Sequence, residues 1–99
     1  MPNPRQVLVA QHLRSSAFAL GIDYPFAERN EYGHLLKIGV TQARSMLAAT
    51  MYDTPMEGGL RCSWPEVASA IGYASHSGAM AAARIGRKEI RKIKRKGKK

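Results

Sequence analysis

Three hydrogen-bonding side chains, those of Ser75, His76 and Ser77, stand together where a helix is expected to begin. A hydroxyl both donates and accepts, and a neutral imidazole offers one donor and one acceptor, so this trio can read DNA base edges without adding charge. Taken alone, a histidine beside serines is more often a helix cap or a packed surface residue. Its position opens the second of two short helices, where side chains meet base edges in helix-turn-helix motifs, and this position favours base contact.

Two helices separated by a tight joint must hold that trio in place. The first is predicted over 63–71, because Ser63 can cap it and Glu66 can reach back to the cap. Gly72 follows at a position where helices commonly end in a left-handed residue. The second is predicted over 76–86, and its small side chains make it slim enough for a major groove about 12 Å wide. The pattern therefore predicts a helix-turn-helix that binds duplex DNA.

The same stretch resembles the C-terminal DNA-binding domain of the bacterial replication initiator DnaA, a helix-turn-helix of the DnaA/TrpR type. The family signature is an apolar helix, a glycine joint and a histidine followed by hydroxyl residues, and 67–72 with His76-Ser77 match its order and spacing. Upstream, 41–49 is similar to the preceding helix of the family. The resemblance covers residues 40 to 86. Three departures leave the target sequence open: Ala74, Ser75 and Gly78.

The resemblance implies roles for individual residues. His76 and Ser77 would reach base edges, and Ser75 stands where the family has a base-reading aspartate. Arg44 and Ser45 stand where the family holds phosphate, whereas position alone would favour a solvated Arg44. The further contacts expected with the DNA backbone are Arg61, Trp64, Arg84, Arg87, Lys88 and Arg91.

Positive charge is concentrated at the end of the chain. The formal net charge is +9, and residues 87–99 hold nine basic residues and one acidic residue. The first 86 residues are nearly neutral, with seven basic and six acidic side chains. The tail is thus the main attractant for nucleic acid, and phosphate neutralisation would make binding steeply salt-dependent. The spacing of the tail isoleucines lets the second helix continue into it, and beyond Lys94 we expect disorder.

Other functional classes find little support. The single cysteine, Cys62, cannot form an internal disulfide, and no metal-ligand spacing links it to the three histidines. No GxxxxGK[ST] phosphate loop and no set of nucleophile, base and orienting group is present, so neither an enzyme nor a cofactor is expected. Without a signal-peptide core or about 18 consecutive apolar residues, the chain is expected to be cytoplasmic and nucleoid-associated. The tail also lacks the apolar wedge of a membrane-binding helix.

The rest of the chain is expected to be helical as well, with helices over 4–20, 29–38 and 41–52, the last capped by its first residue. The first has an Asn-Pro opening and apolar residues three and four apart. Its off-stripe polar residues, Arg5 among them, are interpreted as a solvated face. Residues 53–62 read as a loop because of their proline and glycines. We therefore predict an all-α fold, a compact bundle of about five helices.

The favoured interpretation is a stand-alone, sequence-selective protein that binds double-stranded DNA and regulates transcription of phage or phage-derived genes, such as those of gene transfer agents, with activation favoured. Residues 39–86 would bind DNA, 87–99 would form the basic tail, and 1–38 would offer a surface to a second copy, RNA polymerase or another regulator. Two alternatives stay open: a replication-associated or architectural DNA-binding protein, and an interaction module that targets the replication initiator. Arg61 is as readily solvent-exposed as bound to DNA.

Overall fold

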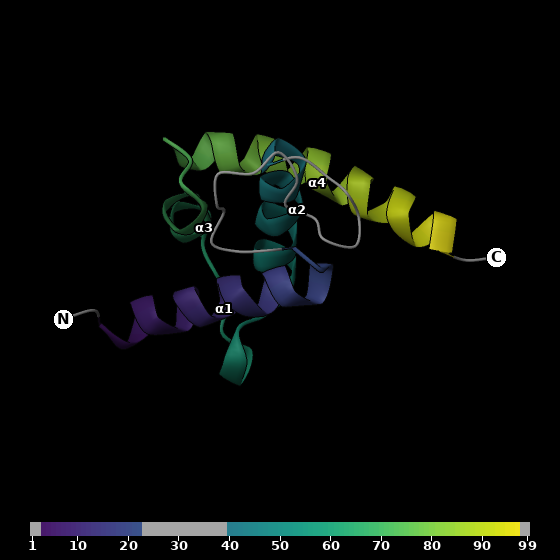
Figure 1. The fold of residues 1–99 in the computed structure, drawn as a ribbon. Helices are drawn as coiled ribbons and strands as arrows, with labels where there is room; N and C mark the ends of the chain where they lie inside the picture. The colour runs from purple at the N-terminus through teal and green to yellow at the C-terminus, as the bar shows by residue number, and fades with distance from the viewer. Residues whose placement is uncertain (1–2, 23–39, 98–99) are drawn as a thin grey trace.

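A central helix, α2 (Val40–Asp53), packs against each of the other three α-helices. The computed structural model describes residues 3–22 and 40–97. Around α2 lie α1 (Pro4–Leu20), α3 (Trp64–Ile71) and α4 (His76–Gly97). Figure 1 shows α1 and α4 running across α2 at opposite ends, with α3 beside it. No β-strand occurs in the described ranges, so this part of the chain is all-α.

The core is built around the apolar surface of α2. Six of its residues are at most 1% exposed: Ala43, Met46, Leu47, Ala48, Ala49 and Met51. Residues 45–49 are consecutive and buried, so the middle of α2 is covered on all sides, and α1, α3 and α4 supply that cover. Their core residues include Val9, Leu13, Val67, Ile71, Ala79, Ala82 and Ala83. One apolar core therefore joins all four helices, and none of them is long and apolar enough to cross a membrane.

Local signals place the ends of α1 as expected over 4–20. The Asn3 side chain accepts a hydrogen bond from the Gln6 backbone N–H at 2.8 Å, and the Gln6 side chain accepts one from the Asn3 N–H at 3.0 Å. This reciprocal pair satisfies two backbone donors that the helix leaves unpaired. At the other end Gly21 has φ 70°, a left-handed conformation that costs glycine little.

The remaining boundaries differ in detail from the sequence predictions. Helix α2 begins one residue before the expected 41–52, so Thr41 lies inside the first turn and is not its cap. Helix α2 also ends one residue later than expected, at Asp53, so the loop predicted over 53–62 begins at residue 54, and it contains a 3-10 turn, Glu57–Gly59. The helix expected over 29–38 lies outside the described residues. The tail is not a separate segment in the described range, because α4 continues without a break to Gly97, three residues past the expected end at Lys94.

The solvated role expected for Arg5 is wrong, because its guanidinium joins α1 to the start of α3. Its Nε lies 2.7 Å from Glu66 Oε2, and its Nη2 donates to Glu66 Oε1 at 2.8 Å. Nη2 also donates to the carbonyl oxygen of Arg61 at 2.6 Å. The hydrogen bonds from Arg5 to Glu66, with those from Ser63, hold the pKa of the Glu66 carboxyl at about 2, below its ordinary 4.5.

Helices α2 and α4 make backbone contact at Gly86. A Cβ placed there would overlap the carbonyl oxygen of Ser45 and lie 2.9 Å from the backbone nitrogen of Met46. The α4 face that leads to this point carries only alanines, Ala79, Ala82 and Ala83, which lets the two helices approach closely. Gly86 is therefore required by packing, not by backbone conformation.

We expect Gly86→Ala to lower the free energy of unfolding by about 1–3 kcal/mol or more, because the added methyl must displace the α2 backbone. The matched control is Gly78→Ala in the same helix, where a Cβ would meet nothing closer than 3.8 Å. There the better helix former should raise stability by up to about 1 kcal/mol. Urea unfolding followed by circular dichroism compares the two, and equal effects would contradict the close crossing.

The Arg5–Glu66 ion pair should make the free energy of unfolding depend on pH in the acidic range. Because the pKa of Glu66 is about 2 in the fold and 4.5 ordinarily, the contribution of the ion pair is complete above pH 4.5 and declines as pH falls toward 2. Glu66→Gln should therefore lower stability at neutral pH and flatten this acid slope. Arg5→Gln should do the same, and the double variant should lose little more, as a double-mutant cycle of unfolding free energies would show.

Candidate nucleic-acid interface

Helices α3 and α4 are joined by a four-residue connection over 72–75. The Ser63 hydroxyl accepts from the Glu66 N–H at 3.3 Å, and the Ser63 N–H donates to Glu66 Oε1 at 2.9 Å, which completes the expected capping box. At the other end Gly72 has φ 101°, where a side chain would be strained. The helix predicted over 63–71 is therefore present as Trp64–Ile71, with Ser63 as its N-cap.

The expected base-reading trio lies together and exposed at the start of α4. The Ser75 hydroxyl accepts from the Gly78 N–H at 3.3 Å, so Ser75 caps α4 and keeps its own O–H proton to donate elsewhere. His76 and Ser77 are the first two residues of the helix. Backbone N–H groups are also unpaired in a first helical turn, which favours a nearby anion such as phosphate. The structure therefore brings Ser75, His76 and Ser77 to one accessible edge.

Arg44 reaches from α2 to the connection that precedes this trio. Its Nη2 lies 3.5 Å from the position that a Cβ on Gly72 would occupy. Burial raises the pKa of the nearby Tyr73 phenol, and the Arg44 charge partly opposes that rise. The Arg44 Nε is buried and has no hydrogen-bond partner among the described residues. The fold thus holds a partly unsatisfied cation beside the start of α4.

Ser45 takes a different place from the one expected. It is 5% exposed, and its hydroxyl donates to the Thr41 carbonyl oxygen at 3.0 Å within α2. Its backbone forms the contact with Gly86. The fold gives Ser45 no exposed hydroxyl with which to hold phosphate, so it is left out of the proposed interface.

Trp64 and Arg61 lie at the opposite end of α3 from the connection, about 12 Å along the helix axis. The Trp64 ring stacks on Tyr52 of α2, with centroids 3.7 Å apart and planes 8° from parallel. Arg61 is exposed, and its Nη1 donates to the Asp53 carbonyl oxygen at 3.5 Å. These two residues therefore have packing and local partners, and α3 does not place them next to the trio.

One cation of α4 is paired with a carboxylate, and several others are exposed to solvent. Arg87 donates to both carboxylate oxygens of Asp53, at 2.8 and 2.7 Å, and these hydrogen bonds lower the pKa of Asp53. In contrast, Arg84, Lys88 and Arg91 are exposed. Their spacing of four and three residues keeps them on one helix face, which also contains Ser77. A stripe of cations therefore begins at Arg84, about two turns beyond Ser77, and runs along the same face of α4.

The acidic residue of α4 is turned away from that stripe. Glu89 Oε2 accepts a hydrogen bond from the Gln42 side-chain amide at 2.7 Å, in the first turn of α2. Negative charge is favoured at a helix N-terminus, so Glu89 also suits its position electrostatically. Lys92 approaches the same carboxylate at 3.7 Å. The contact with α2 thus removes the one acidic side chain of α4 from the exposed cationic face.

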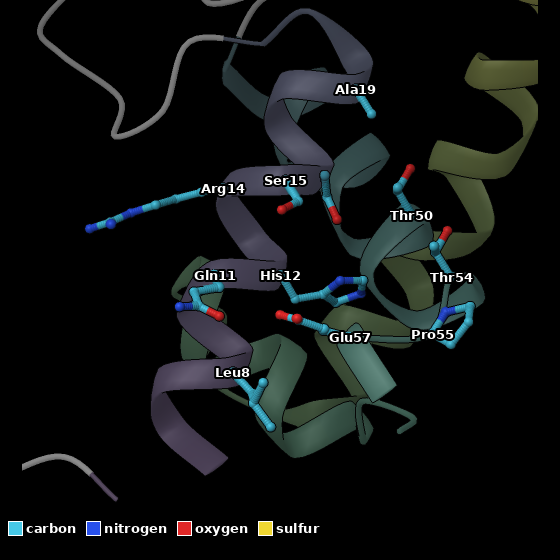
Figure 2. Close-up of a pocket in the computed structure, with 11 residues that line it drawn as sticks. Leu8, Gln11, His12, Arg14, Ser15, Ala19, Thr50, Thr54, Pro55 and Glu57 are labelled. Atoms are coloured by element: carbon cyan, nitrogen blue, oxygen red, sulfur yellow. The ribbon is translucent and has the colours of Figure 1, made fainter. Parts of the chain in front are cut away.

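A hollow of about 680 Å³ lies elsewhere, between α1 and the end of α2. Figure 2 shows the His12 ring and the Glu57 carboxylate pointing into it, with Thr50 and Thr54 on the far wall. His12 is buried, and its Nε2–H donates to the Met51 carbonyl oxygen at 2.8 Å. This hydrogen bond gives a partner to one of the last carbonyl groups of α2, which the helix itself leaves without one. None of the expected DNA contacts lines this hollow.

The described residues contain no other grouping with evident chemistry. Burial raises the pKa of the Cys62 thiol to about 11, which keeps it protonated and poorly nucleophilic. No group of three or more potential metal ligands occurs within 3–22 and 40–97. Comparison of the chain with protein-family models, with curated proteins and with solved structures found no match. The trio, Arg44 and the cation stripe are therefore the features on which a function can be argued.

Sequence reasoning overlooked three features of this region. Gly86 was the end of a predicted helix and proved to be its crossing point with α2. The alanines at spacings of three and four before it were the available signal. Arg87 was expected on the DNA backbone, although Asp53, its partner, lies 34 residues away and no local pattern connects them. Tyr52 likewise pairs with Trp64 only because α2 and α3 are adjacent.

Arg44→Met separates a packing role from a phosphate-binding role, because it keeps the apolar stem and removes the charge. The free energy of unfolding should stay unchanged or rise, since a buried unpaired Nε is lost. DNA affinity should fall, and the slope of log K against log salt should shrink by about 1. Arg14→Met, on the exposed face of α1, is the control and should change neither quantity. A destabilised Arg44→Met variant with an unchanged salt slope would assign Arg44 to packing alone.

Proposed function

We propose that this protein binds double-stranded DNA with sequence selectivity, using the N-terminal end of α4 in the major groove. The observation that carries the proposal is the exposed trio of Ser75, His76 and Ser77 at the tip of a slim helix braced by α3. A helix with uncharged hydrogen-bonding groups at its leading end suits base edges, which present donors and acceptors without net charge. The sequence resemblance to the DnaA C-terminal domain supports the same assignment.

Contacts with phosphate would come from both sides of the trio. Arg44 lies behind it, at the connection between α3 and α4. Arg84, Lys88 and Arg91 extend from it along one face of α4. Such contacts release counterions from DNA, so affinity would depend steeply on salt. Phosphate contacts would orient α4 on the duplex, and the trio would supply the discrimination between sequences.

Arg87, Arg61 and Trp64 take secondary roles in this proposal. The bidentate ion pair with Asp53 makes Arg87 a residue that positions α4 on α2. Arg61 and Trp64, at the far end of α3, would reach DNA only where the duplex extends beyond the groove that receives the trio. The interface is therefore smaller than the set of residues named from sequence.

The biological setting follows from the resemblance alone. We propose a cytoplasmic, nucleoid-associated regulator of transcription in phage or phage-derived genes, with activation favoured. One helix reads few bases, so selectivity would require several sites, a second copy or a protein partner such as RNA polymerase. On α1, Phe18 is 89% exposed and Val7 is 41% exposed, which gives such a partner apolar surface to contact.

A second candidate is an architectural or replication-associated protein that binds DNA for its charge and shape. The continuous cationic half of α4 favours it, because phosphate contacts need no particular sequence. An interaction module that targets the replication initiator is a third candidate, supported by the resemblance. The second predicts little sequence preference, and the third predicts weak DNA binding, so one binding assay distinguishes all three.

His76→Ala should lower the preference for specific over random DNA by about 1–3 kcal/mol, the scale of one good base contact. Binding to random DNA should remain nearly intact. The complementary variant Lys88→Ala/Arg91→Ala should weaken binding to all sequences and reduce the salt slope by about 2. The measurement begins with selection of bound sequences from a random duplex pool, followed by titration of the selected and random duplexes.

Arg14→Ala, which removes an exposed cation from α1, is the matched control for lost charge. Recovery of a motif that His76→Ala weakens selectively would support the proposed function. A motif that survives His76→Ala but is lost when the two cations are removed would contradict the assignment of the trio to the groove. Recovery of no motif would favour the architectural candidate.

A further inference from the structure

The first two turns of α4 expose two apolar side chains beyond the trio. Met80 is 40% exposed, and Ala81 is also exposed. Met80 and Ala81 lie three and four residues after Ser77, and four and three residues before Arg84. These spacings place all four side chains on one face of the helix. The core contacts of α4 come instead from Ala79, Ala82 and Ala83. The pair of Met80 and Ala81 therefore lies in the middle of the face that the proposed function turns toward DNA.

A single exposed methionine is ordinary on a protein surface. Its setting here is distinctive, because residues 76–83 contain no charged side chain, whereas 84–96 contain eight basic residues. The acid in that second stretch, Glu89, is bound to Gln42. The exposed face of α4 thus changes from uncharged and partly apolar to mainly cationic, although Ile85, 57% exposed, is an apolar residue next to Arg84 in the second stretch.

This division matches the major groove of duplex DNA. Its walls carry the phosphates, and its floor presents base edges with donors, acceptors and one apolar group, the C5-methyl of thymine. Arginine and lysine can contact either phosphates or guanine edges, whereas an apolar pair would be misplaced against the charged walls and has a matching group only on the floor. Charge complementarity therefore places Met80 and Ala81 over the bases and Arg84 at the groove edge.

Resting on the proposed function, we propose that Met80 and Ala81 determine specificity by contacting a thymine C5-methyl group. Helical rise separates them from Ser77 by about 5–6 Å along α4. Stacked bases are spaced about 3.4 Å apart, so this thymine lies one to two base pairs from the pair that Ser77 contacts. The trio would supply hydrogen bonds, and the apolar pair would add selection for a methyl group.

Replacement of thymine by uracil tests this contact, because it removes the methyl group and leaves every hydrogen-bonding group in place. Duplexes carrying the selected motif would be prepared with uracil at each thymine position in turn and titrated with the full chain. At one position uracil should weaken binding by about three- to tenfold, the scale of one buried methyl group. Uracil outside the motif is the control and should have no effect.

Two variants assign the effect to the protein. Met80→Gln replaces the thioether with an amide of similar length and should remove most of the difference between the thymine and uracil duplexes at that position, leaving only the smaller contribution of Ala81. Met80→Leu stays apolar and should keep the difference. Because Met80 lies outside the core, both variants should retain the helical circular dichroism and unfolding midpoint of the parent protein.

The possible outcomes separate this inference from the proposed function. A recovered motif without sensitivity to uracil, or with a sensitivity that Met80→Gln leaves unchanged, would overturn the methyl contact while the proposed function stands. Recovery of no motif would overturn both. A uracil effect at one position that Met80→Gln largely removes and Met80→Leu preserves would establish the contact.

Discussion

The close crossing of α4 over α2 at Gly86 is the constraint on which the rest of the arrangement depends. Because a glycine lies against the Ser45 backbone, α4 approaches α2 more closely than any side chain would permit. Two polar contacts then set its rotation and direction, Arg87 with Asp53 and Glu89 with Gln42. Since α4 is continuous from His76 to Gly97, this crossing orients both its leading end and its cationic face.

The fold also sorts charge. Within residues 3–22 and 40–97, three acids pair with side chains of another segment, Glu66 with Arg5, Asp53 with Arg87 and Glu89 with Gln42. Each pairing stabilises contact between two segments and removes a negative group that would repel phosphate. The exposed face of α4 is left neutral at its start and positive thereafter. The same acidic side chains therefore stabilise the packing of the segments and leave the exposed face of α4 without negative charge.

Local sequence signals predicted the helices that have strong caps. The Asn3 opening of α1, the Ser63 capping box and the left-handed Gly72 are formed by residues within a few positions of one another, so their geometry follows from short-range hydrogen bonds. Boundaries without such signals were less accurate, as the start of α2 and the continuation of α4 beyond Lys94 show. The exposed position of Ser75, His76 and Ser77 at the start of α4 also followed from local pattern.

By itself, the sequence determined the helical class, the capped ends and the separation of a near-neutral stretch from a basic one, because these depend on neighbouring residues and composition. Only the tertiary structure decided which cations are exposed and which are bound. Arg5 and Arg87 became structural because acids distant in sequence lie beside them, and Ser45 became buried because α4 crosses there. Such roles depend on which helices meet, and helix contacts are made between residues whose separation along the chain carries no local signal.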